Sequence, residues 1–349
     1  MLKQLDIKNL KSIDKTSLKL APLTLLTGAN SSGKSTAIQA LMLLIKNSQA
    51  SNRYSMEELI RYLSDFAVIR NKKNNAKSIE LTVIDTENTS HFLKLTSEGI
   101  EKSTQLPYLY ELEESAQGAE LLYLNANRIG AQDLVQVSER KVGNLGEYLF
   151  SSFDKIKGRK LPDSLLRFEG SKTISYQLSQ WLSFIAGSQI ELITEKLSDQ
   201  VKVSFSVKDL DTNVSPFNLG AGMSYIAKVI IICLMGKEGD LILLENPEVQ
   251  LHPKAQARLG VFLSYIASSG IQLIVETHCE HLINKIVYEV YQDHIQSDDV
   301  VIHYKSDVGS DFETILIDEN GEFNNIEGDI IGFPTGFFDA TLSDLMNMR

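Results

Sequence analysis

The chain has 349 residues, about two domains' worth, and its 43 % hydrophobic and 23 % charged residues are ordinary for a globular protein. This excludes a disordered or collagen-like chain, and the most apolar stretch, Tyr225–Met235, is interrupted by Lys228 and is shorter than the ~20 residues of a membrane span. The net charge of −11 argues against a protein that coats nucleic acid. The chain opens with charge where a secretory signal is apolar, and Cys233 and Cys279 cannot form a disulfide framework, so we expect a cytoplasmic protein without membrane contact.

The charge is segregated along the chain. Residues 1–77 hold 13 Lys or Arg against 5 Asp or Glu, whereas residues 293–349 hold 13 acidic residues and only Lys305 and Arg349 as basic ones. A basic end can bind phosphates or dock on an acidic one, and a solvated surface accounts for the pattern equally well.

Strands are predicted first. Alternating apolar residues at 2–7 and 18–20 favour strands, and the apolar run Leu23–Leu26, bounded by Pro22 and Gly28, is typical of a buried strand. A helix follows, with an apolar stripe of Ile38, Leu41, Met42 and Ile45. Residues 46–77 are polar and basic, with one amphipathic piece around Met56–Ile69.

The middle of the chain mixes strands with a predicted helical region. Short strands are predicted at Ser78–Ile84, His91–Thr96, Leu121–Leu124, Gln189–Thr194 and Val201–Val207. Residues 132–187 are predicted to be mostly helical, including Leu145–Phe150, Leu165–Phe168 and Tyr176–Phe184, with Trp181 as a packing residue. A helix near Ser224, strand Leu241–Leu244, helix Pro253–Ala267 and strand Gln272–Val275 then alternate as in a parallel α/β sheet.

The strongest motif follows the strand that ends near Gly28. The residues Gly28, Ala29, Asn30, Ser31, Ser32, Gly33, Lys34 and Ser35 fit the phosphate-loop pattern G-x-x-x-x-G-K-[ST] at every fixed position. Its glycines let backbone N–H groups turn around a phosphate, and the next helix points its positive end at the same anion. Lys34 would reach the β- and γ-phosphates and Ser35 would ligate Mg²⁺, so the motif predicts ATP or GTP binding.

Three further segments are typical of the second half of a nucleotide site. The apolar strand 241–244 delivers Glu245, Asn246 and Glu248 at its end, where a metal-organising acid is expected. The predicted strand Gln272–Val275 is followed by the polar residues Glu276, Thr277 and His278. His278 could donate a hydrogen bond to a γ-phosphate, although a lone histidine is more often structural. The glycine-rich turn 218–224, with Asn218, Gly220, Gly222 and Ser224, opens a helix and offers N–H groups to an anion.

The segments that follow the phosphate loop resemble those of the ABC-type ATPase heads and come in the same order: NLGAGMS, LILLENPEVQLHP and VETHCEHLI. Among them the chain looks most like the soluble RecF and SMC relatives, and above all like the OLD-like AAA/ABC ATPases of bacterial antiphage and repair loci. The resemblance is good over about 1–50 and 210–290 and moderate over 120–131. It implies an α/β P-loop ABC-ATPase head, a mixed sheet with helices on both faces, formed by 1–131 and 205–349. A mostly helical insertion, 132–204, would interrupt it, and the acidic tail would be 293–349.

The resemblance also implies roles for single residues. Residues Gly28–Thr36 would be the Walker A loop, and Glu245 would stand where the Walker B acid holds Mg²⁺ through water. Asn218–Ser224 would replace the signature sequence and meet the γ-phosphate of ATP held by a second copy. Leu251–Pro253 would be the D-loop region and His278 the switch histidine, with Arg128 or Gln132 near the Q-loop. Two subunits of such heads sandwich two ATP molecules, so ATP binding closes the homodimer and hydrolysis opens it.

One residue departs from the family pattern. Such heads carry a glutamate after the Walker B acid, and here that position is Asn246. An amide can orient water but cannot take its proton, so we expect slow hydrolysis unless Glu248 or Glu276 substitutes.

Three functions stay open at this point. The first is an ATP-driven switch that controls an effector, such as a nuclease, in phage defence; 290–349 holds no Asp-x-Asp metal site, so we expect no intrinsic nuclease. The second is a RecF-like repair ATPase that contacts DNA through basic residues of two segments, Arg70, Lys72, Lys73 and Lys77 in one and Lys155, Lys157, Arg159 and Lys160 in the other. The third is a non-hydrolysing ATP-binding scaffold. The aromatic run 332–338 is expected to pack on the core, with partner docking as its alternative.

Overall fold

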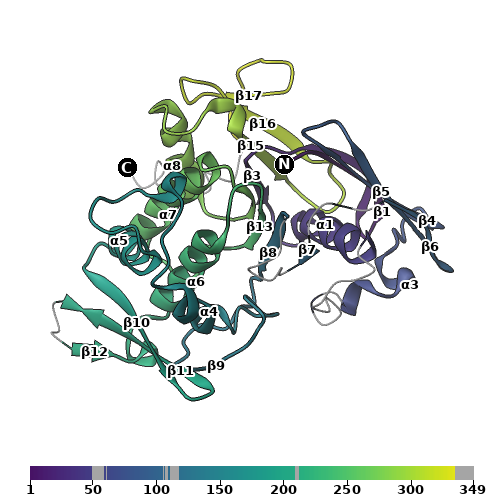
Figure 1. The fold of residues 1–349 in the computed structure, drawn as a ribbon. Helices are drawn as coiled ribbons and strands as arrows, with labels where there is room; N and C mark the ends of the chain where they lie inside the picture. The colour runs from purple at the N-terminus through teal and green to yellow at the C-terminus, as the bar shows by residue number, and fades with distance from the viewer. Residues whose placement is uncertain are drawn as a thin grey trace, which may run out of the picture.

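The computed structural model describes residues 1–48, 59, 61–104, 106, 109–110, 118–208 and 212–334. An eight-stranded sheet lies at the centre, with the strand order β17-β16-β15-β3-β14-β13-β8-β7 (Figure 1). Its parallel strands are β3 (Leu23–Gly28), β7 (Leu109–Tyr110), β8 (Glu120–Leu124), β13 (Leu241–Glu245), β14 (Gln272–Glu276) and β15 (Val300–Lys305). Two antiparallel strands, β16 (Glu313–Ile317) and β17 (Phe323–Asn324), complete one edge.

The central sheet is buried on both faces, which is why its strands are short apolar runs. Leu121 and Leu243 pack on the face that carries helix α1 (Lys34–Ser48). The next residues along the same strands, Leu122 and Leu244, pack on the opposite face. Because successive side chains of a strand point to opposite faces, each short run supplies two cores. The predicted α/β fold, a mixed sheet with helices on both faces, is confirmed.

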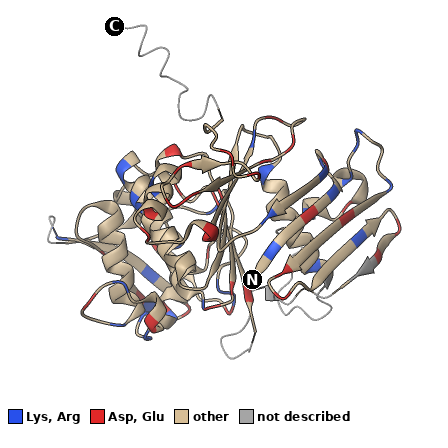
Figure 2. Ribbon diagram, turned by 90° about the horizontal axis from the view of Figure 1, so that it is seen from above, with Lys and Arg blue, Asp and Glu red and all other residues tan. Residues whose placement is uncertain are grey.

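The N-terminal lobe is a five-stranded antiparallel sheet with the order β2-β1-β4-β5-β6. Its strands are β1 (Leu2–Leu10), β2 (Ile13–Lys19), β4 (Ser78–Asp85), β5 (Ser90–Thr96) and β6 (Gly99–Ser103). Alternate side chains such as Leu5 and Leu81 turn inward and join α1 in one core. On its other face Lys8 pairs with Glu80, and basic and acidic residues lie side by side on this sheet (Figure 2), so the lobe is not uniformly basic.

Helices cover the opposite face of the central sheet. They are α5 (Ile174–Ala186), α6 (Ala221–Met235), α7 (Pro253–Ser268) and α8 (Glu280–Tyr291). Trp181 lies in this layer, 1 % exposed, with its ring 4.9 Å from that of Phe262. It is the packing residue that its sequence context indicated.

The insertion 132–204 differs from its prediction. It holds two α-helices, α5 and α4 (Leu149–Ile156), followed by the two predicted strands β10 (Ile190–Leu197) and β11 (Gln200–Val207). Within 132–187 the α-helices cover only 149–156 and 174–186, and β9 (Leu134–Gln136) is a strand that was not predicted, so the mostly helical character of 132–187 is wrong. β9 and β12 (Thr212–Val214) both pair with β11. Residues 145–148, predicted as helix, are not helical, because Gly143 and Gly146 have positive φ values and α4 begins only at Leu149. Residues 166–168 are not helical either, since the short 3-10 helix Asp163–Leu165, which has Pro162 as its N-cap, ends before them.

Two predicted segments lie partly outside the described residues. Of the amphipathic piece 56–69, the structure describes a 3-10 helix, Arg61–Leu63, and the short helix α3 (Phe66–Ile69). Of the aromatic run 332–338 it describes 332–334, where Phe333 lies 5.1 Å from the ring of Phe323 and packs on the core as expected. No helix in the described part of the chain is long and apolar enough to cross a membrane.

A buried ion pair at the start of β8 gives a stability prediction. Glu120, 2 % exposed, accepts from Lys141 at 2.7 Å, and burial raises the pKa of Glu120 to about 7 despite this lysine. Lys141→Met raises the pKa of Glu120 further. In the wild type, the free energy of unfolding stops falling with pH once Glu120 has ionised, near pH 7. In the variant it continues to fall above pH 7, because the folded state still holds the proton. We expect a loss of about 3 kcal/mol at pH 8.5 and a much smaller one at pH 6, measured by urea unfolding. A double variant, Lys141→Met with Glu120→Gln, should recover most of it, and an equal loss at both pH values would contradict the assignment.

Candidate nucleotide-binding site

The phosphate loop joins β3 to α1 at the carboxyl edge of the central sheet. Gly28 has φ +124° and Gly33 has φ +111°, a region that glycine adopts without strain. A Cβ at Gly28 would lie 2.1 Å from the carbonyl oxygen of Lys305, so the loop rests directly on the neighbouring strand β15. The N–H of Ala29 donates to this same oxygen at 3.0 Å. The predicted strand–loop–helix context of the motif is therefore present.

Lys34 is held at the rim of this loop. Its Nζ donates to the carbonyl oxygens of Gly28, at 3.1 Å, and Ala29, at 2.5 Å, and the residue is 2 % exposed. Burial lowers the pKa of Lys34, and the charge of Glu276 partly opposes this. A lysine that is bonded only to neutral oxygens is available to an anionic ligand.

Two carboxylates stand side by side at the strand ends next to the loop. Glu245 on β13 and Glu276 on β14 are paired in register, and β14 is the neighbour of β3. Glu245 accepts from the Tyr123 hydroxyl at 2.9 Å and from the Ala126 N–H at 3.1 Å. Burial raises the pKa of both glutamates, while Ser35 and Lys34 stabilise the charged form of Glu276. The carboxylate that contacts Ser35 is thus Glu276, which the sequence had indicated only as a substitute base.

Asn246 and Glu248 follow Glu245 in a turn. Asn246 has φ +45°, its N–H donates to the Glu276 carbonyl at 2.8 Å, and its buried Oδ1 has no hydrogen-bond partner. Glu248 accepts from the His278 N–H at 3.0 Å through Oε1, whereas its buried Oε2 has no partner. Burial raises the pKa of Glu248. Buried polar atoms without partners are rare and mark a place where a ligand, water or ion belongs.

Arg128 fixes the turn from the other side. Its guanidinium donates at 2.9 Å to the carbonyl oxygens of both Glu245 and Asn246, and the residue is 2 % exposed. Burial lowers its pKa to about 10, with the charge of Glu248 opposing, so the group stays cationic at neutral pH. Arg128 therefore acts on the backbone of the strand end, whereas Gln132 bonds to the Glu147 carbonyl and to Lys228.

His278 lies next to the phosphate loop. Burial and the charge of Lys34 lower the pKa of His278, and a hydrogen bond to the Gly28 backbone opposes this. The imidazole is consequently neutral at physiological pH, and its one N–H is donated to the Gly28 backbone. The structure thus brings together Lys34, Ser35, Glu245, Asn246, Glu248, Glu276 and His278.

The segment 218–224 is separate from this cluster. It begins α6, which packs against α4, α5 and β8, on the opposite face of the central sheet from α1. Asn218, Gly220 and Ala221 are exposed, and Gly220 caps the helix without a side-chain hydrogen bond. A Cβ at Gly222 would lie 2.5 Å from the Gln250 carbonyl, so this turn lies against the predicted D-loop region 251–253. The buried Ser224 hydroxyl has no partner.

The donor set fits a nucleotide with Mg²⁺ better than a metal alone. No group of three or more His, Cys, Asp or Glu within the described residues is arranged to hold a metal ion. Mg²⁺ is usually bound by one or two carboxylates together with substrate phosphates. Ser35, Glu245 and Glu276 can supply that protein share, and Glu248 and Glu276, whose charges interact, each have an oxygen without a hydrogen-bond partner.

Comparison with known proteins decides the family. The family model described as "AAA domain, putative AbiEii toxin, Type IV TA system" matches residues 54–284, more than half of the chain. The chain belongs to this AAA-domain family. A second model, "AAA ATPase domain", matches residues 1–98, which contain the phosphate loop. Both results confirm the ATPase-family resemblance that the motifs indicated.

A curated relative and two solved structures agree with this AAA assignment. The chain is 24 % identical over 324 residues to the OLD nuclease of Thermus scotoductus (strain ATCC 700910 / SA-01), covering 80 % of this chain and 59 % of that nuclease. The SMC head bound to the C-winged helix domain of ScpA has a TM-score of 0.57 at 14 % identity, covering 90 % of this chain and 97 % of that one. A second SMC head, with an extended coiled coil and bound to the C-terminal domain of ScpA derived from Pyrococcus furiosus, has a TM-score of 0.55 at 12 % identity. The match covers 90 % of this chain and 96 % of that one. The fold is therefore that of an SMC-like head.

Proposed function

We propose that this AAA-family head binds ATP with Mg²⁺, hydrolyses it slowly, and closes as a sandwich of two copies around the nucleotides. One observation carries the proposal: helix α1, which follows the phosphate loop, and helix α6, which follows the turn 218–224, pack on opposite faces of the same sheet. The start of α6 is exposed, and its backbone N–H groups do not contact the phosphate loop of the same chain. A second copy can bring these donors to the γ-phosphate.

Each residue of the cluster has a role in this proposal. Lys34 would exchange its hydrogen bonds to the Gly28 and Ala29 carbonyls for contacts with the β- and γ-phosphates. Ser35 together with Glu245 or Glu276 would hold the cation, which neutralises phosphate charge when bound. His278, neutral and next to Gly28, would exchange its hydrogen bond to the Gly28 backbone for one to the γ-phosphate. Arg128 keeps the carbonyls of Glu245 and Asn246 in place, so the turn stays positioned during turnover.

Slow hydrolysis follows from Asn246. Its Oδ1 can accept a hydrogen bond from the attacking water but cannot remove the proton. Glu248 and Glu276 each have an unpartnered Oε2 and a pKa raised by burial, so these two carboxylates are the candidates to accept that proton. ATP would then hold the dimer closed for a long time between hydrolysis events, as suits a switch for a partner effector, such as a nuclease in antiphage defence.

Two alternative functions rest on particular residues. A RecF-like role in repair is favoured by Arg70, Lys72 and Lys73, which line one cavity, and would give salt-dependent binding of duplex DNA. A scaffold that binds ATP without hydrolysing it is favoured by Asn246 alone. Higher oligomers are compatible with either.

Steady-state ATP hydrolysis with and without duplex DNA tests the proposal, with Lys34→Ala as the blank. We expect a turnover well below one per second that disappears in the variant, together with tight ATP binding by the wild type. DNA stimulation would favour the repair function, and tight binding without turnover would favour the scaffold. A turnover of tens per second, or wild-type protein that binds no ATP, would contradict the proposal.

A further inference from the structure

A second buried lysine lies against the phosphate loop. Lys305 is the last residue of β15 and is paired in register with Gly28. Its carbonyl oxygen accepts a hydrogen bond from the Ala29 N–H, so its backbone supports the start of the phosphate loop. Its side chain runs to the other end of the loop, where Cε lies 3.5 Å from the position a Cβ on Gly33 would take. The residue is 2 % exposed, as is Lys34.

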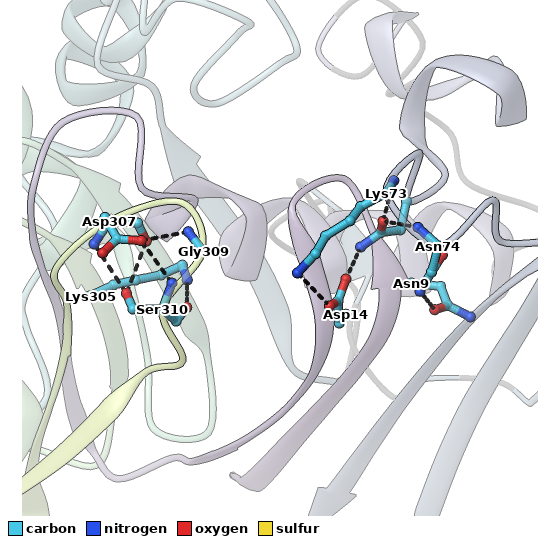
Figure 3. A network of polar contacts seen from close by, with 9 residues as sticks. Asn9, Asp14, Lys73, Asn74, Lys305, Asp307, Gly309 and Ser310 are labelled. Carbon is cyan, nitrogen blue, oxygen red and sulfur yellow. Dashed lines mark hydrogen bonds and ion pairs between the residues drawn. The ribbon is translucent and has the colours of Figure 1, made fainter.

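Lys305 has no carboxylate partner among the described residues. Its Nζ donates to the Ser310 carbonyl and lies 5.2 Å from the centre of the Phe312 ring. Burial lowers the pKa of Lys305, and the charges of Asp311 and Asp307 oppose this without forming an ion pair with it. Asp307 instead accepts from the N–H groups of Gly309 and Ser310, and Asp14 accepts from Asn71 and Lys73 (Figure 3). A buried ammonium group without an ion pair is only partly compensated by carboxylates at longer range, so an anionic ligand in direct contact would be favoured here.

A cavity gives such a ligand access to this lysine. It has a volume of about 420 Å³ and is walled by the hairpin 11–16, the segment 68–73 and the loop 305–312. Four further cations line it, Lys11, Arg70, Lys72 and Lys73, against the two acids Asp14 and Asp311. Ser12 from the same hairpin has its Oγ 2.8 Å from the Cβ position of Gly33, so the cavity opens beside the Gly33 end of the loop.

Burial by itself does not make a lysine a ligand site, as Lys228 illustrates. Lys228 is 0 % exposed, but its Nζ donates to Ile129 O at 2.7 Å and to Gln132 Oε1 at 2.5 Å inside the core. Lys305 differs because it lines a cavity that adjoins the phosphate loop.

We propose that Lys305 is a second phosphate-binding lysine of the ATP site and that it contacts the α-phosphate. Lys34 sits at the Gly28 end of the loop and serves the β- and γ-phosphates. Lys305 reaches the Gly33 end, from which the nucleoside continues into the cavity, so it meets the phosphate nearest the ribose. This inference rests on the proposed function, since it requires that ATP binds at the loop.

The test compares the affinities for ATP, ADP and AMP, each measured by competition with a fluorescent ATP analogue. Lys305→Met should weaken all three by a similar factor of about 10 to 100, because the α-phosphate is common to them. Lys34→Ala should weaken ATP and ADP far more than AMP. Lys172→Met, which removes an exposed lysine outside this cavity, should stay within about twofold of wild type, as expected for a surface charge screened by solvent.

The possible outcomes separate the inference from the proposed function. If the wild type binds no nucleotide, the proposed function fails and the inference with it. If the wild type binds and a folded Lys305→Met variant matches it for all three ligands, or loses affinity for ATP alone, only the inference is overturned. Lys305→Gln keeps a donor for the Ser310 carbonyl, so it replaces the methionine variant if thermal unfolding shows that the latter does not fold.

Discussion

Replacing Asn246 with glutamate is expected to raise the rate of ATP hydrolysis by about 100-fold, the contribution that a positioned general base usually makes. The new carboxylate would lie among Glu245, Glu248 and Glu276, whose pKa values are all raised by burial. A pKa raised towards neutrality makes the base stronger while it remains ionised at pH 7.5. The backbone at Asn246 has φ +45°, so glutamate would cost about 1 kcal/mol of stability.

Two controls sharpen this measurement. Asn246→Gln has the size of glutamate without its charge and should leave the rate within a few-fold of wild type. The rate of the glutamate variant should also fall as the pH drops below the pKa of the new carboxylate. An unchanged rate in a variant that still binds ATP would show that Asn246 is not what limits hydrolysis.

Replacing Arg128 with methionine is expected to cost about 3 kcal/mol of stability and most of the hydrolysis. The change leaves the carbonyls of Glu245 and Asn246 without their buried donors, and the charges of Glu245 and Glu248 without their nearest cation. Thermal unfolding measures the first effect and steady-state hydrolysis the second.

Arg128→Lys separates the charge from the hydrogen-bond geometry. Lysine keeps the cation but cannot donate to two carbonyls from a planar fork, so the variant should recover much of the stability and little of the activity. Full activity in either variant would show that the position of the strand end does not depend on Arg128.

Local motifs were predictable because they depend on local chemistry. The phosphate loop requires glycines at fixed positions between a buried strand and a helix, and Gly28 and Gly33 adopt the positive φ values that this requires. The strands at 23–26, 241–244 and 272–275 were found because a doubly buried strand is a short apolar run. Most of the cluster at the carboxyl edge followed from these strands.

Longer-range neighbours could not be predicted. Lys305 adjoins the phosphate loop only because β15 pairs with β3, across more than 270 residues of sequence. Glu276 contacts Ser35 because β14, rather than β13, is the neighbour of β3, and strand order is not encoded in either strand alone. The insertion was misjudged since amphipathic segments such as 145–150 and 165–168 suit helices by composition. In the structure, glycines with positive φ at 143 and 146 keep α4 from starting before Leu149, and the 3-10 helix that begins after Pro162 ends at Leu165.

The most direct test of the ATP sandwich mixes two defective proteins. Lys34→Ala disables the phosphate loop, and Gly220→Arg blocks the start of α6 at an exposed position with open space for a side chain. Each homodimer then has two defective sites, but a mixed dimer has one intact site. Dimer formation is measured by energy transfer between differently labelled proteins, with Mg²⁺ and with or without ATP. We expect ATP-dependent association of the wild type, none for either variant alone, and recovery of ATP-dependent association in the equimolar mixture. Association that ignores ATP, or a mixture as inactive as its components, would contradict a site built from two copies.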